Sequence, residues 1–356
     1  MTRFAFIIHP ISARDVARKY PAAKWFPDSW IEAFLKLKHP MILSKIEGIQ
    51  SITGAKTEGW FIGCPLTPRQ MVGGSLPLEF VYGRILECAE IAKKEGAELI
   101  GLGAFTSVVG DGGITIAERS PIAVTTGNSY TVATAIEGTV KACHDIGFDT
   151  AESTLAVVGA TGAIGKTCAK ILGPKFARTY VIGRDLARAQ DVAGEVRNAI
   201  GTVELDVLRQ ADAVISVTSS DAAIILPEHL KPGSVVCDVA RPRDVSVRVG
   251  KERPDVLVIE GGVVSVPGEV NFNFNFGFPP KTAYACMSET MMLALDGRAE
   301  NFTLGKDVSV EQVEETQRLA AKHGFKLAGF RSFEKAVTDE AIARARAART
   351  KTPAAV

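Results

Sequence analysis

From Thr154 onward, short apolar runs alternate with segments whose apolar residues recur at helical spacing. The runs lie at 155–158, 179–182, 213–217, 234–239 and 256–259. Helices are expected between the first of these runs, at 163–172 and 186–199. Fully apolar strands that alternate with helices are typical of a parallel sheet covered on both faces. The pattern therefore predicts an α/β fold with a Rossmann-type, doubly wound parallel sheet over residues 151–280.

The rest of the chain is patterned less regularly. Residues 1–150 combine apolar runs at 4–8, 99–103 and 122–126 with helical spacing at 78–94 and 129–144, which predicts an N-terminal α/β substrate domain. Residues 281–356 are predicted to form C-terminal helices at 282–295, 310–323 and 332–346. Ser309 and Gln312 have the spacing of a capping box, and the last arginines are expected to form a solvated tail.

Charge and cysteine usage exclude several classes of protein. Lys and Arg number 41 against 40 Asp and Glu, so the chain lacks the basic excess of a dominant nucleic-acid or membrane-surface footprint. A transmembrane helix needs about 18 apolar residues in a row, and no such run occurs. A secretory signal is not found either, and the six cysteines form no C-x-x-C pair. We therefore expect reduced thiols, a cytoplasmic location and no metal site.

The strongest motif is a glycine-rich stretch between the first apolar run and the following helix. It comprises Gly159, Ala160, Thr161, Gly162, Ala163, Ile164 and Gly165. Glycines allow a tight strand-to-helix turn and a close approach of the backbone to a pyrophosphate, which the helix N-terminus attracts. The spacing is G-x-x-G-x-x-G rather than the commoner G-x-G-x-x-G. The surrounding strand and helix favour a dinucleotide site over a turn that binds nothing.

The end of the second strand distinguishes the two nicotinamide cofactors. An NAD site carries an acidic residue there, whereas this chain has Ile182-Gly183-Arg184. The guanidinium groups of Arg184 and Arg188 could bind a 2′-phosphate, and Asp185 is expected to cap the next helix. The hypothesis is NADPH, with a plain surface role for Arg184 as the alternative.

A reactive thiolate is favoured near a helix N-terminus, where its pKa is lowered. Cys286 lies in the first turns of the helix expected at 282–295, although a cysteine is more often a small core residue. Cys64, in a proline-rich turn, is a weaker candidate. The alternating phenylalanines of 272–278 would share one face of a strand, either covering the core or forming an apolar wall for a substrate.

Several short phrases recur together in a known order. They lie at 102–107, 125–131, 157–165, 261–264, 285–293, 301–305 and 322–325. From about residue 99 to 326 this series resembles the long-chain acyl-[acyl-carrier-protein] reductases of cyanobacteria. The stretch 265–281, the residues after 330 and the start of the chain depart from that pattern, which leaves chain length and carrier open.

The resemblance implies reduction of a long-chain fatty acyl thioester to a fatty aldehyde with NADPH, through an acyl-enzyme on Cys286. Asn128 and Thr126 are then expected oxyanion donors, and His323 is an expected proton-exchange group, although a lone histidine is more often structural. An acyl carrier protein is the expected partner, with Lys36, Lys38, Lys93 and Lys94 as a possible docking patch. A shikimate- or amino-acid-type dehydrogenase and a non-catalytic NADPH sensor are the alternatives.

Overall fold

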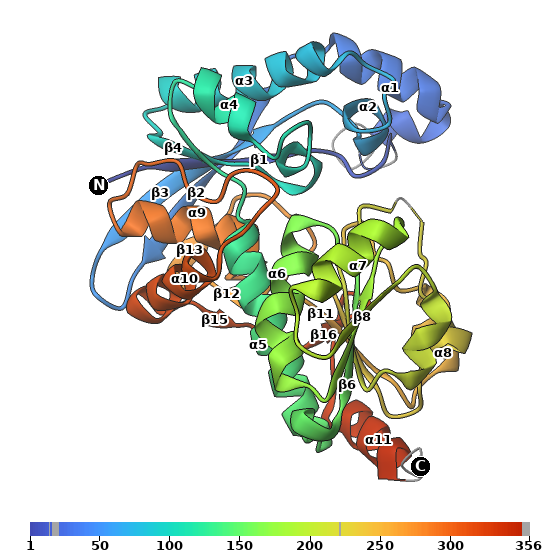
Figure 1. Cartoon of the computed structure of the whole chain (residues 1–356). Coiled ribbons are helices and arrows are strands. Elements are labelled where there is room, and N and C mark those ends of the chain that lie inside the picture. Colours follow the sequence, from blue (N-terminus) through green and yellow to red (C-terminus); the bar gives the residue numbers. More distant parts are fainter. Residues whose placement is uncertain (14, 16–20, 221, 351–356) are drawn as a thin grey trace. The chain divides into compact units, whose positions relative to one another are not determined.

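The computed structural model describes residues 1–13, 15, 21–220 and 222–350 (Figure 1). The chain packs into two compact units, each built from several stretches. Unit 1 comprises Met1–Gly127, Ser265–Lys306 and Glu315–Lys326, and unit 2 comprises Asn128–Val264, Asp307–Glu314 and Leu327–Val356. The segment expected at 281–356 is therefore divided between both units. The division of the sequence into 1–150, 151–280 and 281–356 stays a prediction.

Unit 1 contains a six-stranded mixed sheet. Its strands, in order across the sheet, are β13 (Gly268–Asn271), β2 (Met41–Gln50), β3 (Lys56–Gly63), β1 (Phe4–Ile8), β4 (Leu99–Gly101) and β5 (Ala123–Thr125). β3, β1, β4 and β5 run parallel, while β2 and β13 are antiparallel additions at one edge.

The two faces of this sheet carry different helices because successive side chains of a strand point to opposite sides. Ala5, Ile7 and Ile62 belong to the core that packs against α3 (Leu78–Lys94). α9 (Ala285–Leu295) packs on β1, β3 and β4. It lies on the side of Phe6, since a Cβ at Gly101 would meet both Phe6 and Thr290 of α9. Figure 1 shows α3 and α9 on either side of this sheet. The remaining helical turns of unit 1 are η2 (Pro21–Trp25), α1 (Asp28–Leu37), α2 (Pro68–Met71), η3 (Ala104–Ser107) and α4 (Ile114–Arg119).

Unit 2 contains a six-stranded, entirely parallel sheet. Its strands, in order, are β11 (Leu257–Glu260), β10 (Val235–Asp238), β9 (Ala213–Ser216), β6 (Thr154–Val158), β7 (Arg178–Ile182) and β8 (Ala199–Thr202). The chain runs outward from β6 to β8 and then returns to β9 beside β6. This reversal is the topological switch point of a doubly wound sheet, where ligands bind beyond the carboxyl ends of the strands. The expected fold class is confirmed.

Helices complete unit 2. They are α5 (Asn128–Ile146), α6 (Ala163–Leu172), α7 (Leu186–Gly194), α8 (Val247–Glu252) and α11 (Asp339–Thr350), with the short turns η4 (Thr150–Glu152), η5 (Gly173–Lys175), η6 (Leu205–Gln210) and η7 (Pro227–His229). α10 (Val310–His323) contains residues of both units. Its expected capping box is confirmed, since the N–H groups of Ser309 and Gln312 donate to each other's side chains at 3.1 Å. Among the described helices, none is both long and apolar enough to cross a bilayer.

Three expected helices have different bounds. α7 ends at Gly194 instead of 199, because Asn198 has a positive φ of 53° and the chain then forms β8. β14 (Thr282–Tyr284) occupies the start of the helix expected at 282–295. β16 (Arg331–Ser332) and β17 (Lys335–Ala336) form a hairpin before α11. Two more short strands, β12 (Val263–Ser265) and β15 (Lys326–Leu327), complete the chain.

The expected solvated tail is also corrected in part. Arg349 forms an ion pair with Asp212 at 3.0 Å and lies 3.7 Å from the centre of the Phe148 ring. Arg346 donates to the carbonyl of Asp145. The last turns of α11 are therefore anchored to unit 2, and Lys351 lies outside the described residues.

Candidate functional site

The glycine loop of unit 2 connects β6 directly to α6, as the sequence predicts. The N–H groups of Gly159 and Ala160 donate to the carbonyl of Ile182 at 2.9 and 3.0 Å, which ties the loop to the end of β7. Gly162 is the N-cap of α6, and Ala163, Ile164 and Gly165 form its first turn. The N–H groups of a first turn have no acceptor within the helix. They are therefore available to an anionic ligand at the positive end of the helix dipole.

Two of the three glycines are required by the fold itself. Gly159 has a φ of +81°, and a Cβ there would lie 2.6 Å from the carbonyl oxygen of Val217. A Cβ at Gly165 would lie 2.4 Å from the carbonyl oxygen of Gly159. Gly162 differs, since the nearest atom to a Cβ there is 3.4 Å away. This backbone surface without side chains is what a pyrophosphate needs for a close approach, so the loop fits a dinucleotide.

The arginines expected to select NADPH lie at the carboxyl end of β7. Arg184 is exposed, one residue beyond Gly183. Arg188 is held over the loop, because its guanidinium donates to the carbonyl of Thr161 at 3.2 Å. Asp185 caps α7 by accepting the N–H of Arg188 at 3.0 Å, in the role expected for it. Arg184 as a phosphate ligand stays a prediction.

The cysteine site lies in unit 1. Because β14 precedes it, α9 begins at Ala285 and Cys286 is the second residue of the helix. The Cys286 side chain is half-buried, whereas the other five cysteines are buried. Burial raises the pKa of the Cys143 and Cys237 thiols to about 12, and it also raises the pKa of Cys88 and Cys168. Cys286 alone among the six combines partial exposure with a helix N-terminus, which favours a reactive thiolate.

Gly127 packs directly against Cys286. A Cβ at Gly127 would lie 2.3 Å from both Cα and Cβ of Cys286, and the φ of Gly127 is +75°. Both the available space and the backbone conformation therefore require glycine at this position.

A buried carboxyl group on the same helix was not foreseen from the sequence. Glu289 is 0% exposed and lies one turn after Cys286, on the same side of α9. The hydroxyl of Thr125 donates to Glu289 Oε1 at 2.5 Å and accepts the N–H of Gly127 at 3.4 Å. The segment 125–127 is thus fastened to α9 at Glu289 and packed against it at Cys286. The recurring phrase at 285–293 contains Glu289, but its hydrogen-bond partner, Thr125, lies 164 positions earlier in the sequence. The sequence pattern alone therefore does not indicate this contact.

The two expected oxyanion donors lie on either side of Gly127. The Thr126 hydroxyl and N–H both donate to the carbonyl of Thr303, at 2.7 and 3.2 Å, so Thr126 is engaged in holding its own segment. Asn128 directly follows Gly127 as the first residue of α5, and its side chain is buried. Asn128 as an oxyanion donor stays a prediction.

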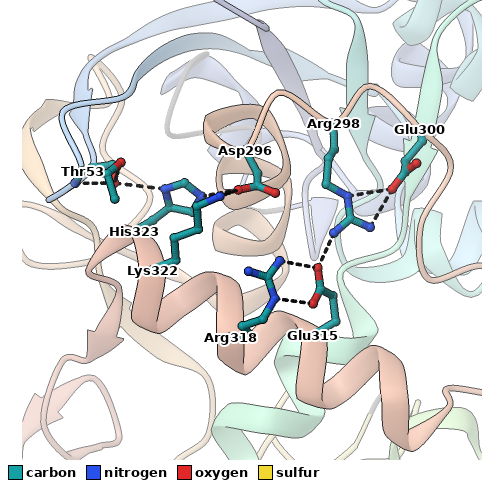
Figure 2. Close-up of polar contacts among 9 residues, drawn as sticks. Thr53, Asp296, Arg298, Glu300, Glu315, Arg318, Lys322 and His323 are labelled. Atoms are coloured by element: carbon teal, nitrogen blue, oxygen red, sulfur yellow. Dashed lines mark hydrogen bonds and ion pairs between the residues drawn. The ribbon is translucent and has the colours of Figure 1, made fainter.

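His323 is not brought to Cys286. Its Nδ1 lies 3.0 Å from Ser51 Oγ and its Nε2 lies 3.2 Å from Asp296 Oδ1 (Figure 2). Asp296 is the C-cap of α9, ten residues after Cys286, which corresponds to about 15 Å along a helix. Burial lowers the pKa of the His323 ring. These contacts link α10 to the end of α9 and to the Ser51 turn, and they give no support to proton exchange between His323 and Cys286, which stays a prediction.

The four lysines considered as a docking patch do not gather in one place. The Lys36 ammonium lies 6.0 Å from the ring centre of Phe80, in the first turn of α3. Lys93 and Lys94 form the last turn of the same helix, about 20 Å further along its axis.

The phenylalanines of 272–278 are not one strand, because β13 ends at Asn271 and Asn273 has a positive φ of 48°. Their rings nevertheless pack against one another, beginning at Phe61 of β3. Phe272 and Phe276 lie 5.9 and 5.5 Å from the ring centre of Phe61, and Phe276 lies 5.6 Å from Phe278. Phe278 contacts Tyr284, the N-cap of α9, at 4.4 Å. A continuous row of aromatic rings therefore leads from the sheet to the helix that carries Cys286.

Comparison with known proteins gives three kinds of match: to a family, to individual proteins and to a solved structure. Residues 141–260 match the shikimate / quinate 5-dehydrogenase family. The chain is 31% identical to the aminotransferase PigE of Serratia sp. (strain ATCC 39006) over 78% of its own length, but it spans only 33% of PigE. It is 26% identical to the long-chain acyl-[acyl-carrier-protein] reductase of Synechococcus elongatus over 88% of this chain and 94% of that protein. Among solved structures, L-tryptophan dehydrogenase from Nostoc punctiforme is similar with a TM-score of 0.41 and 14% identity, over 98% of this chain and 88% of that one.

The family match agrees with the architecture of unit 2. The dehydrogenase family match contains the glycine loop, α6, β7 and Arg184. The chain therefore has the fold of an NAD(P)-binding oxidoreductase, and the matches agree with NADPH as the cofactor.

Proposed function

We propose that this protein reduces a long-chain fatty acyl thioester to a fatty aldehyde with NADPH, by way of an acyl group held on Cys286. The observation that carries the proposal is the geometry of Cys286, a half-buried thiol at the start of α9 with Gly127 packed against it. The similarity to a long-chain acyl-[acyl-carrier-protein] reductase over nearly the whole of both chains supports it.

In the proposed reaction, Cys286 Sγ attacks the carbonyl carbon of the thioester. The new C–S bond forms as the bond to the carrier sulfur breaks, and the carrier leaves as a free thiol after taking up a proton. The helix N-terminus of α9 favours the thiolate form of Cys286. Glu289 acts as a positioning residue, because through Thr125 it holds Gly127 against the nucleophile.

Gly159, Gly162, Gly165 and the first turn of α6 would hold the pyrophosphate of the cofactor, with Arg184 at its 2′-phosphate. When bound, NADPH supplies the two electrons that reduce the acyl carbon to the aldehyde level. Overall, one thioester, one NADPH and one proton give an aldehyde, a carrier thiol and NADP⁺. Arg184→Ala should raise the Michaelis constant for NADPH about tenfold and leave that for NADH unchanged. An unchanged NADPH constant would remove Arg184 from the site.

The aromatic row from Phe61 to Tyr284 supports a long apolar acyl chain as the substrate group, since it ends at the cap of the helix bearing Cys286. The carrier thiol belongs to an acyl carrier protein or to coenzyme A. Turnover with both thioesters, measured side by side, decides between these carriers.

The decisive experiment detects the acyl-enzyme. Incubation with palmitoyl-coenzyme A without NADPH should add one acyl group, mapped by mass spectrometry to Cys286. Cys286→Ser should abolish this thioester adduct and lower turnover by about a thousandfold or more. Cys168→Ala, at a buried cysteine of α6, is the matched control and should keep the adduct. If Cys286→Ser still formed the same amount of acyl thioester adduct, the proposal would be wrong.

A second candidate is a dehydrogenase of the shikimate or amino-acid type. The match of residues 141–260 to the shikimate / quinate 5-dehydrogenase family favours it. The matched stretch contains the glycine loop but not Cys286. Such an enzyme needs no cysteine. Oxidation of a hydroxy or amino acid that survives in Cys286→Ala, without any acyl adduct in the parent protein, would select this candidate.

A further inference from the structure

The beginning of unit 1 exposes an unusual amount of aromatic surface. Trp25 is 88% exposed, Trp30 66% and Leu37 77%, and Phe26 and Phe34 are also exposed. All five belong to η2, α1 or the turn between them. Phe26 stacks on Trp30 at 6.3 Å, so the side chains form a continuous surface, the α1 stripe.

The stripe follows from the spacing of the helix. Trp30, Ala33, Phe34 and Leu37 are at positions i, i+3, i+4 and i+7, which fall on one face of α1. Ile31 and Leu35 face elsewhere and are buried with Ala13. α1 thus has two apolar faces. One is buried in the core of the unit, and the other is in contact with solvent.

Lysines border the stripe. Lys24 lies in the last turn of η2, Lys36 lies in the last turn of α1, and Lys38 directly follows that helix. The Lys38 ammonium lies 4.6 Å from the ring centre of Phe34, at the edge of the stripe. The acidic side chain of Glu32 is turned inward, where it accepts the hydroxyl of Thr67 at 3.1 Å. Asp28, exposed in the first turn of α1, is the acidic exception. The border of the stripe therefore carries three lysines against one aspartate, although the whole chain has a net charge of only +1.

We propose that α1 docks on the surface of an anionic lipid bilayer, with the α1 stripe inserted at the level of the headgroups. Trp, Phe and Leu on one face with Lys beside them is the composition of a helix lying in a membrane interface. Tryptophan prefers this depth because its ring is apolar while its N–H remains hydrated. The lysines complement the negative charge of the headgroups. This inference is independent of the proposed reaction.

The composition of the stripe favours a lipid surface over a second protein. Lysine is depleted in protein interfaces, whereas it is typical of interfacial helices.

The three tryptophans make the test direct, because Trp25 and Trp30 lie on the stripe while Trp60 is 7% exposed. Full-length protein is mixed with vesicles of phosphatidylcholine, with and without phosphatidylglycerol. With the anionic vesicles we expect co-sedimentation and a blue shift of tryptophan emission. Substituting all three lysines, Lys24→Gln, Lys36→Gln and Lys38→Gln, should weaken binding and its dependence on phosphatidylglycerol.

Two double variants separate contact from folding. Trp25→Ser with Trp30→Ser should weaken vesicle binding by at least about tenfold. Trp25→Phe with Trp30→Phe keeps the apolar surface, so it should co-sediment nearly as well but lose the emission shift, since only Trp60 remains. Ile52→Ser, at an apolar residue 73% exposed elsewhere in unit 1, is the control and should bind like the parent.

Three results would overturn the inference. One is a lack of co-sedimentation with either vesicle, and another is equal binding by the serine double variant. The third is an emission shift that appears without lipid as protein concentration rises, which would assign the stripe to contacts between copies of the chain.

Discussion

The glycine loop of unit 2 and the cysteine site of unit 1 both depend on glycine, but in different ways. In the loop, Gly165 is crowded by the backbone of Gly159 within one strand–turn–helix segment, and Gly159 is crowded by the backbone of Val217, which follows β9. At the cysteine site, Gly127 is crowded by Cys286, a residue that is 159 positions away. The loop glycines thus make room for main-chain carbonyl groups, whereas Gly127 makes room for one particular residue, the candidate nucleophile.

This difference determines how each site fails. The loop depends on main-chain groups of unit 2, namely its hydrogen bonds to the carbonyl of Ile182 and its contact with the carbonyl of Val217. The cysteine site depends on side chains that hold distant segments together, such as Thr125 and Glu289. Substitutions can therefore separate damage to cofactor binding from damage to the nucleophile.

The largest effect is expected for Gly127→Ala. The added methyl group would overlap the backbone of Cys286, so α9 or the segment before α5 must shift. Turnover and the rate of Cys286 alkylation by iodoacetamide should fall by about a hundredfold. Gly54→Ala is the control, since Gly54 also has a positive φ but an added methyl group there would meet no described atom within 4 Å. It should cost only about 1 kcal/mol of unfolding free energy. Equal behaviour of the two variants would mean that Gly127 matters only for its backbone angle.

The next effect concerns cofactor binding. Gly165→Ala forces a methyl group against Gly159 and should weaken both NADPH binding and thermal stability. Gly162→Ala has room in the structure, so its stability should be unchanged while NADPH binding falls about tenfold, because a pyrophosphate needs close backbone approach. Calorimetric titration and thermal unfolding measure the two quantities. Gly194→Ala, in open space at the end of α7, should change neither. Unchanged NADPH binding in Gly162→Ala would argue against this loop as the phosphate site.

A smaller effect is expected at the bond between Thr125 and Glu289. Thr125→Val keeps the shape but removes the donor, which leaves a buried carboxyl group without that hydrogen bond. Turnover should fall about tenfold while the Michaelis constant for the thioester is unchanged. Thr125→Ser restores the hydroxyl and should recover most of the rate. If valine and serine behave alike, the hydroxyl does not position Cys286.

The two units should also respond oppositely to acid. Burial lowers the pKa of His9 in unit 1 to about 4, and Nε2 accepts the N–H of Phe105 at 3.1 Å. Its neutral form stabilises unit 1 fully above pH 6.5, and this contribution is lost as the pH falls toward 4. Burial raises the pKa of Asp238 in unit 2 to about 6. The folded state then takes up a proton first, so unit 2 gains up to about 2–3 kcal/mol as the pH falls from 6 toward 4.

Hydrogen exchange read by peptide in each unit, corrected for intrinsic rates, measures this contrast. His9→Gln keeps an acceptor for Phe105 without titrating in this range, and Asp238→Asn removes the carboxyl group. Each variant should flatten the pH dependence of its own unit only. A variant whose unit keeps the slope of the parent would show that another group causes it.

The features that sequence patterns predicted best are local ones. The bounds of α6 and α10 agree with expectation because apolar spacing, the glycine turn and the Ser309 cap all lie within a few residues. β8 was missed because it is a short edge strand of moderate burial, which carries no continuous apolar run. The start of α9 was placed too early, since 282–284 has helical spacing in the sequence but forms β14 in the fold.

The cysteine site could be predicted only in part. Cys286 was identified from its position near a helix start and from a family resemblance. The sequence gives no sign of the roles of Glu289 and Thr125, because the residues of one segment do not reveal a hydrogen bond to a residue 164 positions away. His323 is the opposite case, since a histidine in a recurring phrase invites a chemical role, whereas in the structure its ring contacts Ser51 and Asp296.

The path of the backbone has a practical consequence for engineering. No single cut separates the units, because the chain passes from one to the other after Gly127, Val264, Lys306, Glu314 and Lys326. Neither unit can therefore be moved into another protein as one continuous segment with two junctions. Swapping the dinucleotide-binding portion between related enzymes would need matched junctions at every passage. Ribosomal synthesis likewise completes unit 1 only once Lys326 has emerged, and unit 2 only with the stretch that follows it.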